Sequence, residues 1–420
     1  MGNMFSDRIS DVPRSFIRDI LKMTVDESII SFAGGMPNRD LFPVREINAA
    51  IDRLFAECGK DILQYSTSEG YRGLREWIAG RYKSRMGIDV HPDNILITSG
   101  SQEGLDLLGK TFLNEGDDVV IEEPGYLGAI QAFSVYKARF NPVPVDMSGM
   151  DAVRLKRALD DRRIKLLYMV PNFQNPSGIS YSQENRREIA SLLDGRDTIL
   201  IEDDPYGELR FRAGGAKRSS FYQLIRENTV LLGSFSKIVA PSFRVGWLVA
   251  GDEIMEKLVV AKQASDLHTN YFGQRAILKY LEENDIDRHI EKIRTAYGRQ
   301  RDAMIKAIEE HFPPEVKFTR PEGGMFLWIT LPGGLTAMDV FKLAILRKVA
   351  FVPGDPFYIN KKGVNALRLN YSCVDEETIR TGIKRLGDVL KEMIGNRAAK
   401  RPSLPGRGAS GKRRYRKPRQ

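Results

Sequence analysis

The chain has 420 residues, of which 42% are hydrophobic and 28% charged, and its formal net charge is +9. A chain of this length can bury a large core and exceeds one ordinary domain, so two domains are expected. The positive charge suggests a nucleic-acid partner, but residues 397–420 hold ten Lys or Arg and no Asp or Glu. Removing those ten charges leaves −1, so the body of the chain does not have the charge of a nucleic-acid binder.

The C-terminal segment 395–420 is rich in Pro, Gly and Ser and has almost no large apolar side chains. Such a segment cannot offset its ordering entropy by burial, so we expect a disordered basic tail. Its Lys and Arg side chains could touch RNA, DNA or an acidic lipid surface. The alternative is a solvated tail without a specific partner.

Other features of the composition exclude several classes of protein. Cys58 and Cys373 are the only cysteines, too few for a disulfide framework, which indicates a reducing compartment and predicts a cytoplasmic protein. No apolar run is long enough to span a bilayer, and the N-terminus lacks the apolar core of a signal peptide. The four histidines are scattered without ligand spacing, so neither a membrane anchor nor a metal site is expected.

The first predicted strand that leads into a candidate binding turn lies within residues 94–112, NILITSGSQEGLDLLGKTF. The pattern predicts a strand, a short turn containing glycine and then a helix, with the backbone amides of Ser101 and Gln102 at the helix N-terminus. A helix N-terminus favours anions, so this turn is a candidate anion site. The alternative is a plain strand-to-helix connection in which Ser101 caps the helix.

The next predicted strands also end in polar residues: Tyr126 follows VVIEE, Asn175 follows LLYMV, and Asp203 and Tyr206 follow TILIE. Strands alternate here with amphipathic helices, which predicts a mostly parallel sheet covered on both faces. A ligand of such a sheet lies beyond the carboxyl ends of its strands, so these side chains can converge. Taken singly, Asn175 could serve a turn, Asp203 a helix cap, and the tyrosines ordinary packing.

The stretch GSFSKIVAPSFRVGW places Lys237 beside the hydroxyls of Ser234 and Ser236 and ahead of Arg244. Hydroxyls and a guanidinium can hold an anion, and the apolar runs on both sides predict strands that deliver the group to a sheet edge. A lysine that bonds covalently to the aldehyde of pyridoxal phosphate fits this pattern. The alternative is an ordinary solvated lysine in a turn.

Eight segments of the chain carry a combined pattern: QYSTSEGYRGLRE, TSGSQEGLDL, EEPGY, VPNFQNPSG, EDDPYGELRF, SFSKIVAPSFRVGW, PEGGMFLW and LRLNYS. Together they resemble the fold-type I pyridoxal phosphate aminotransferases, in family order and over nearly the whole chain apart from the tail. The likeness extends to the subgroup of 2-aminoadipate and kynurenine aminotransferases and MocR-type regulators. It implies an α/β fold with a large, mostly parallel sheet domain of the seven-stranded type and a small α+β domain.

The resemblance implies roles at the cofactor ring. Lys237 would bond to the cofactor, be displaced by the amino acid and then move the Cα proton, which needs a neutral amine; partial burial and cationic neighbours should lower its pKa. Asp203 would pair with the pyridine nitrogen and keep it protonated, and Tyr126 would stack on the ring. Asn175 and Tyr206 would hydrogen-bond the phenolic oxygen.

Further implied roles concern the phosphate and the substrate. Tyr65 would reach the phosphate in the neighbouring subunit, which implies a homodimer with composite sites. Arg368 would hold the substrate's α-carboxylate in a bidentate fork, Asn175 would also contact the substrate, and Gly35 would bring backbone close to it. By themselves, Arg368 could form a surface ion pair and Gly35 a simple turn. The phosphate would be held by Ser101, Gln102, Ser234, Ser236 and Arg244.

The resemblance also sets the expected domains. Residues 47–287 would form the large cofactor-binding domain and residues 288–394 the small C-terminal domain. The N-terminal segment 1–46 would pack with the small domain, and the tail 395–420 would follow. One local departure is Ser242, where many relatives carry glycine; serine lacks glycine's freedom at positive φ, so the loop path could differ there.

The expected activity is transfer of an amino group from an α-amino acid, of the 2-aminoadipate, aromatic or aliphatic type, to 2-oxoglutarate by a ping-pong mechanism. Two alternatives remain open at this point. One is another pyridoxal phosphate reaction, such as β-elimination or decarboxylation, which would use nearly the same residues. The other is a MocR-type regulator that senses the cofactor, which would need an N-terminal DNA-binding module; the sequence before Ser31 leaves no room for one.

Overall fold

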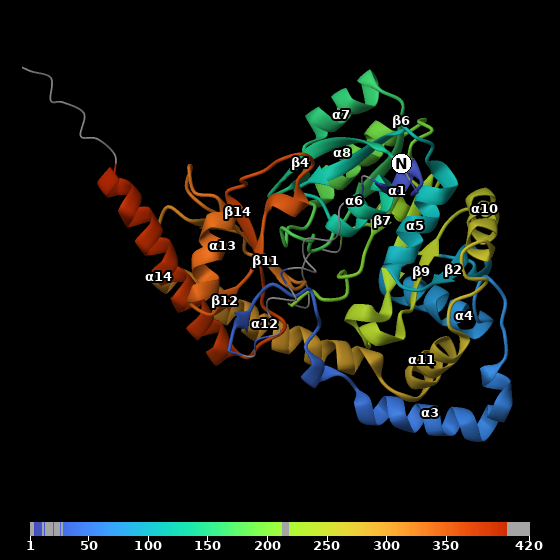
Figure 1. Ribbon diagram of the computed structural model, residues 1–420. Coiled ribbons are helices and arrows are strands. Elements are labelled where there is room, and N and C mark those ends of the chain that lie inside the picture. The colour runs from blue at the N-terminus through green and yellow to red at the C-terminus, as the bar shows by residue number, and fades with distance from the viewer. Residues whose placement is uncertain are drawn as a thin grey trace, which may run out of the picture.

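The computed structural model describes residues 4–10, 12, 20, 26, 28–211 and 218–400, the last four without their side chains. Its larger part is built on one eight-stranded sheet (Figure 1). In chain order the strands are β2 (Ile95–Thr98), β3 (Asp118–Glu123), β4 (Arg139–Asp146), β5 (Gly149–Met150), β6 (Ile164–Met169), β7 (Ile199–Asp203), β8 (Thr229–Ser234) and β9 (Gly246–Val249).

The order of the strands across the sheet is β2-β9-β8-β7-β6-β3-β4-β5. Neighbours from β8 to β4 are parallel, whereas β9 is antiparallel to both β2 and β8. The two-residue β5 pairs antiparallel with β4 at the edge. Without β5 the sheet has seven strands, so the mostly parallel sheet of the seven-stranded type is confirmed.

The strands are apolar on both faces, and helices cover both sides of the sheet. In β3, Val119 and Ile121 belong to one hydrophobic cluster and Val120 to another, because successive side chains point to opposite faces. Strands of this kind appear in the sequence as continuous apolar runs. The helices around the sheet are α4 (Arg72–Arg81), α5 (Ser101–Phe112), α6 (Leu127–Ser134), α7 (Ala152–Asp161), α8 (Gln183–Leu193), α9 (Phe221–Leu224), α10 (Asp252–Gln263) and α11 (Tyr271–Glu283), with α3 (Val44–Cys58) packed against α11.

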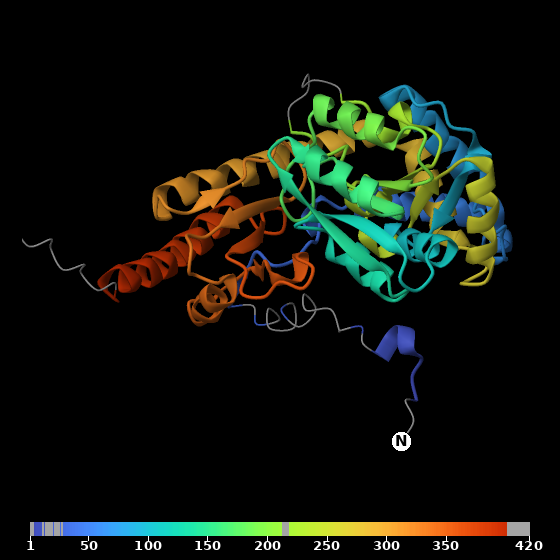
Figure 2. The same cartoon turned by 90° about the horizontal axis from the view of Figure 1, so that it is seen from above.

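A smaller antiparallel sheet forms the C-terminal part, in the order β10-β11-β14-β13. Its strands are β10 (Lys317–Phe318), β11 (Phe326–Thr330), β13 (Val352–Pro353) and β14 (Ala366–Asn370). The long helix α12 (Ile286–His311) leads from the large sheet's part to the small one, where it packs on α14 (Glu376–Lys400) (Figure 2). Helix α13 (Ala337–Leu346) packs on α14 as well.

The described part of the N-terminal segment touches the small sheet's part. Strand β1 (Ile30–Ser31) pairs in parallel with β12 (Val349–Ala350), and the Asn38 amide donates to the Tyr297 hydroxyl on α12 at 2.9 Å. Most of residues 11–27 lie outside the described residues, so the packing expected for the whole segment 1–46 stays a prediction. The domain boundaries at residues 46, 287 and 394 stay a prediction.

Helix α14 continues to Lys400, six residues into the segment predicted as a disordered tail, and residues 401–420 lie outside the described part of the chain. Within the described residues, no helix has both the length and the apolarity required to cross a membrane. The same residues hold no group of three His, Cys, Asp or Glu arranged to bind a metal ion. Cys58 and Cys373 are both free thiols.

Candidate active site

A cavity of about 280 Å³ lies beyond the carboxyl ends of β6, β7 and β8, closed on the other side by residues of β11 and β14. The structure brings together here every candidate that the sequence identified except Tyr65. That residue is 77% exposed and lies edge-on to the His268 ring, with 5.7 Å between ring centroids. The candidates that line the cavity are Gly35, Ser101, Gln102, Tyr126, Asn175, Asp203, Tyr206, Ser234, Ser236, Lys237, Arg244 and Arg368.

Lys237 enters the cavity from the turn that follows β8, where Phe235–Lys237 form one 3-10 turn. Its Nζ donates to the Gly35 carbonyl at 2.9 Å. Burial lowers its pKa to about 8, and the positive charges of Arg368 and Arg244 act in the same direction, while Cys373 opposes them. The lowered pKa expected from the sequence is confirmed, so a large fraction of this amine is neutral near pH 8.

The pKa of Lys237 predicts how the cofactor-free protein captures pyridoxal phosphate. Only the neutral amine attacks an aldehyde, so the rate of covalent capture should rise with pH and reach half its maximum near pH 8. Mixing cofactor-free protein with pyridoxal phosphate across a pH series, and following the visible absorbance, measures this rate. A midpoint near 10.5, the value of an ordinary lysine, would contradict the pKa assigned here.

Asp203 ends β7 and is 3% exposed. Its Oδ2 accepts a hydrogen bond from the Tyr168 hydroxyl at 2.8 Å, whereas its buried Oδ1 has no partner among the described residues. Burial raises its pKa to about 7, and the Asp204 charge adds to this, although the Tyr168 hydrogen bond lowers it. A buried carboxylate oxygen without a partner is costly, so Oδ1 requires a donor such as a protonated ring nitrogen.

Arg368 on β14 is 2% exposed and faces the cavity. Nη1 donates to Asn175 Oδ1 and Nη2 to the Ala33 carbonyl, both at 2.8 Å, and its buried Nε has no partner within the described part of the chain. Burial lowers its pKa to about 10. The guanidinium stacks over the Phe326 ring at 4.3 Å and the Phe357 ring at 5.3 Å, which fixes its plane. The arginine is therefore a buried, preorganised fork and not a surface ion pair.

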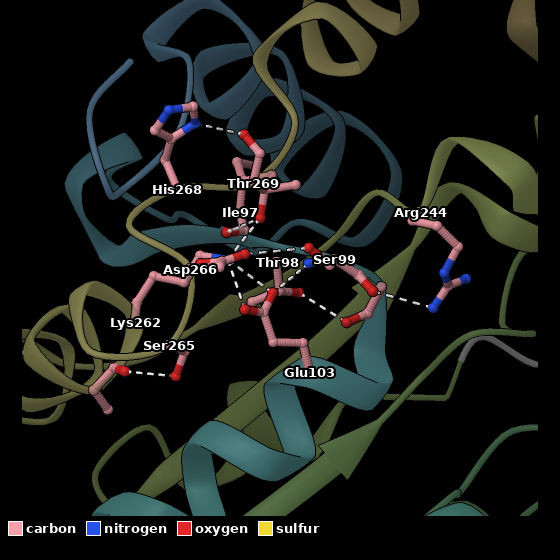
Figure 3. A network of polar contacts seen from close by, with 12 residues as sticks. Ile97, Thr98, Ser99, Glu103, Arg244, Lys262, Ser265, Asp266, His268 and Thr269 are labelled. Atoms are coloured by element: carbon pink, nitrogen blue, oxygen red, sulfur yellow. Dashed lines mark hydrogen bonds and ion pairs between the residues drawn. The ribbon is translucent and has the colours of Figure 1, made fainter. Parts of the chain in front are cut away.

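The predicted anion turn lies at the N-terminus of α5. Gly100 has φ +82°, which favours glycine, and a Cβ there would also crowd the Arg244 guanidinium. Arg244 Nη2 donates to the Ser99 carbonyl at 3.1 Å (Figure 3). The Ser101 hydroxyl lies 3.4 Å from the Gly233 carbonyl, and Ser236 N donates to the Ser234 hydroxyl at 3.1 Å. Amides, hydroxyls and a guanidinium thus surround one corner of the cavity, a suitable cradle for a phosphate.

The loop after Lys237 differs from the sequence-based expectation in one detail. Ser242 lies inside the 3-10 turn Pro241–Phe243 and is not among the residues with positive φ. Arg244 instead adopts the left-handed conformation, with φ +53°. The serine therefore does not strain the loop, and the doubt that it raised about the loop path does not apply.

Several residues that line the cavity or lie next to it had not been identified from the sequence. Phe326 and Phe357 contribute aromatic walls beside Arg368, and Tyr168 supports Asp203 from outside the cavity. Tyr168 had a signal, since it is the one residue with a hydroxyl in the apolar strand β6. The two phenylalanines had none, because an apolar residue in a strand, such as Phe326 in β11, or in a buried turn, such as Phe357 in the 3-10 turn Asp355–Phe357, is normally core. The lining also includes Leu127, Val170, Pro205 and Pro241.

These residues fit pyridoxal phosphate: an amine of lowered pKa, a carboxylate oxygen in need of a donor and a phosphate cradle share one cavity. The family model for "Aminotransferase class I and II" matches residues 28–386. The chain belongs to this family. It is an aminotransferase of fold type I, and its cofactor is pyridoxal 5′-phosphate.

Named relatives are similar to this chain over most of their length, and a solved structure has the same fold. The chain is 41% identical to aromatic-amino-acid aminotransferase 1 of Thermococcus litoralis, over 92% of this chain and 94% of that protein. It is 43% identical to the 2-aminoadipate transaminase of Thermus thermophilus, over 91% and 95%. The crystal structure of Pyrococcus horikoshii kynurenine aminotransferase in complex with PMP superimposes with a TM-score of 0.88, at 41% identity and over 93% of this chain and 98% of that one.

Proposed function

We propose that this enzyme transfers the amino group of an α-amino acid, of the aromatic, aliphatic or 2-aminoadipate type, to 2-oxoglutarate by a ping-pong mechanism. The observation that carries the proposal is the meeting of Lys237, Asp203 and Arg368 in one cavity. An amine that is readily neutral, a carboxylate with a free oxygen and a buried guanidinium fork are the three groups that transamination requires.

Bound pyridoxal phosphate supplies an aldehyde for the amine and a ring that withdraws electrons from the substrate's Cα. Asp203, whose Oδ1 has no partner among the described residues, would keep the ring nitrogen protonated. Lys237 would hold the cofactor and, once released as a neutral amine, could accept the Cα proton and pass it to the cofactor carbon that carried the aldehyde. Arg368 binds the α-carboxylate and thereby orients the Cα–H bond, which favours proton removal over loss of carbon dioxide.

Other residues that line the cavity support the same proposed reaction. Tyr126 lines the cavity and forms the N-cap of α6, where its ring can cover the cofactor's face. Asn175 and Tyr206 are both buried and both line the cavity, which supports hydrogen bonding by their side chains to the phenolic oxygen. Leu127, Phe326 and Phe357 add apolar surface near the fork, which supports aromatic and aliphatic donors beside 2-aminoadipate.

The proposal is tested by a screen of amino donors against 2-oxoglutarate with the purified holoenzyme. Aromatic amino acids, 2-aminoadipate and leucine should each be offered at several concentrations, and formation of glutamate and of the new 2-oxo acid should be measured together. We expect equal amounts of the two products with at least one donor. Absence of glutamate with every donor would refute the proposed reaction.

Replacing Asp203 with asparagine should damage chemistry more than cofactor binding. Asparagine is nearly isosteric and can still bond to Tyr168, but it cannot stabilise a protonated ring nitrogen, so kcat should fall by about 10²-fold to 10³-fold. The dissociation constant of the cofactor, measured by titration of visible absorbance, should change far less. As a control, Asp204→Asn changes the neighbouring carboxylate, which does not line this cavity. Equal losses of kcat in both variants would contradict the role given to Asp203.

We further propose that the enzyme is a cytoplasmic homodimer in which Tyr65 serves the partner's site. Tyr65 is 77% exposed and lies away from its own cavity, which supports delivery to another subunit. Two free thiols in a chain of this length support a reducing compartment. Sedimentation of the holoenzyme should give the mass of a dimer and cell fractionation should recover it in the cytosol; a monomer with full activity would refute the composite site.

A further inference from the structure

Lys262 is a buried lysine outside the active-site cavity. It lies in the last turn of α10, and its side chain is 0% exposed. Its Nζ donates to both carboxylate oxygens of Glu103, at 2.7 and 2.8 Å, to Asp266 Oδ2 at 2.9 Å and to the Thr269 hydroxyl at 2.8 Å. A buried ammonium is tolerated only when it is paired and hydrogen-bonded in this way.

The network continues from Lys262 into the phosphate cradle (Figure 3). Glu103, in the first turn of α5, accepts a hydrogen bond from the Ser99 amide at 2.5 Å. The carbonyl of Ser99 in turn accepts from Arg244 Nη2 at 3.1 Å. The backbone of Ser99 is therefore held on both sides, through its amide by Glu103 and through its carbonyl by Arg244. It directly precedes Gly100, whose left-handed backbone opens the turn.

The opposite end of the network reaches the segment that carries Tyr65. Thr269, bonded to Lys262, also donates through its hydroxyl to the Ile97 carbonyl of β2 at 3.1 Å. The adjacent His268 lies with Nδ1 2.9 Å from the Thr269 carbonyl, and its Nε2 accepts from the Ser66 amide at 3.3 Å. The Tyr65 ring packs edge-on against His268. A continuous set of contacts thus links the anion turn to the Tyr65 segment.

We propose that Lys262 is a positioning residue for the cofactor's phosphate. By neutralising Glu103 and Asp266 it keeps the Glu103 carboxylate on the Ser99 amide, and so fixes the turn whose free amides face the anion. Without its positive charge, two carboxylates would remain close together under the turn and repel each other. Through Thr269 and His268 the same lysine also supports the Tyr65 segment. This inference rests on the proposed placement of the phosphate at the Ser101 turn.

The test compares pyridoxal phosphate with pyridoxal, which lacks the phosphate but has the same ring and aldehyde. Lys262→Met keeps an unbranched side chain that is one atom shorter, and it removes the charge. We expect its dissociation constant for pyridoxal phosphate to rise by about 10-fold to 100-fold, the range typical for loss of a supporting contact at a metal site. The dissociation constant for pyridoxal should stay within about twofold of wild type, and kcat at saturating cofactor within about threefold. General damage to the fold would weaken both ligands equally.

Lys279→Met is the matched control. Lys279 also bridges two carboxylates, Glu57 at 2.6 Å and Glu283 at 3.3 Å, but it lies on α11 and touches no residue of the turn. Its replacement should leave both dissociation constants unchanged. Unchanged affinity for pyridoxal phosphate in folded Lys262→Met, or an equal loss for both ligands, would overturn the inference.

Two more variants separate the possible failures. Arg244→Met should lower the affinity for pyridoxal phosphate but not that for pyridoxal. If it does not, the proposed placement of the phosphate is wrong. If Arg244→Met has this effect and Lys262→Met does not, the placement stands and only the role of Lys262 is refuted.

If Lys262→Met does not fold, Thr269→Val removes one of the lysine's acceptors with a side chain of equal shape. It should raise the dissociation constant for pyridoxal phosphate by about threefold and leave that for pyridoxal unchanged, and no selective change would overturn the inference.

Discussion

Replacement of Lys237 by alanine should abolish transamination, with a fall in kcat of at least about 10⁴-fold. The variant loses both functions of the amine at once, because alanine can neither bond to the cofactor nor accept the Cα proton. No other lysine lines the cavity in the described part of the chain, so no neighbouring amine can substitute. Activity with the best amino donor and 2-oxoglutarate, measured at saturating pyridoxal phosphate, gives the value of kcat.

The Lys237→Ala variant should keep its fold and much of its affinity for pyridoxal phosphate, because the phosphate cradle of Ser101 and Arg244 remains. Equilibrium dialysis should therefore show pyridoxal phosphate bound without the visible absorbance of the covalent form. Lys361→Ala is the appropriate control, because Lys361 forms an ion pair with Glu123 at 2.6 Å and does not line the cavity. A Lys237→Ala enzyme of normal activity would invalidate the whole account of the site.

The second large effect is expected from Arg368. In Arg368→Lys the charge remains, but a single ammonium cannot form the bidentate contact of a planar fork, nor serve Asn175 and the Ala33 carbonyl at the same time. We expect KM to rise by about 100-fold or more for both the amino acid and the oxo acid, because both present the same carboxylate. Steady-state kinetics with each substrate varied in turn measures the change.

A matched control for Arg368 is Arg347→Lys. Arg347 pairs with Glu392 at 3.1 Å on the surface, with 58% of its side chain exposed, and such a pair contributes little. Its replacement should leave both KM values unchanged. If Arg368→Lys altered the KM of the amino acid but not that of the oxo acid, a common carboxylate site would be refuted.

The sequence was sufficient to predict the sheet and most of the site because both depend on local patterns. Apolar runs such as β7 end in polar residues, and parallel strands bring those ends to one edge, so Asp203 and Lys237 could be placed together without coordinates. The turn before α5 could be predicted for the same reason, from its glycine and serine.

Contacts between distant segments could not be derived from local patterns. Asn175 and Arg368 are 193 residues apart, and their hydrogen bond depends on how the small sheet packs on the large one. Phe326 resembles an ordinary core residue in the sequence, and only its position beside Arg368 distinguishes it. The hydroxyl of Tyr168 is unusual in an apolar strand, but its hydrogen bond to Asp203 joins two strands and could not be derived from the pattern of one. Lys262 was missed because a lysine near a helix C-terminus is normally solvated, whereas here it is fully buried.

The most direct test of the central claim is the half-reaction of the holoenzyme with an amino acid alone. Without an oxo acid, a transaminating enzyme can turn over only once, because its cofactor keeps the amino group. We predict one equivalent of the corresponding 2-oxo acid per subunit, loss of the visible absorbance of the covalent cofactor, and recovery of both activity and absorbance on addition of 2-oxoglutarate. Continued product formation without an oxo acid, with release of ammonia or carbon dioxide, would contradict transamination and establish elimination or decarboxylation instead.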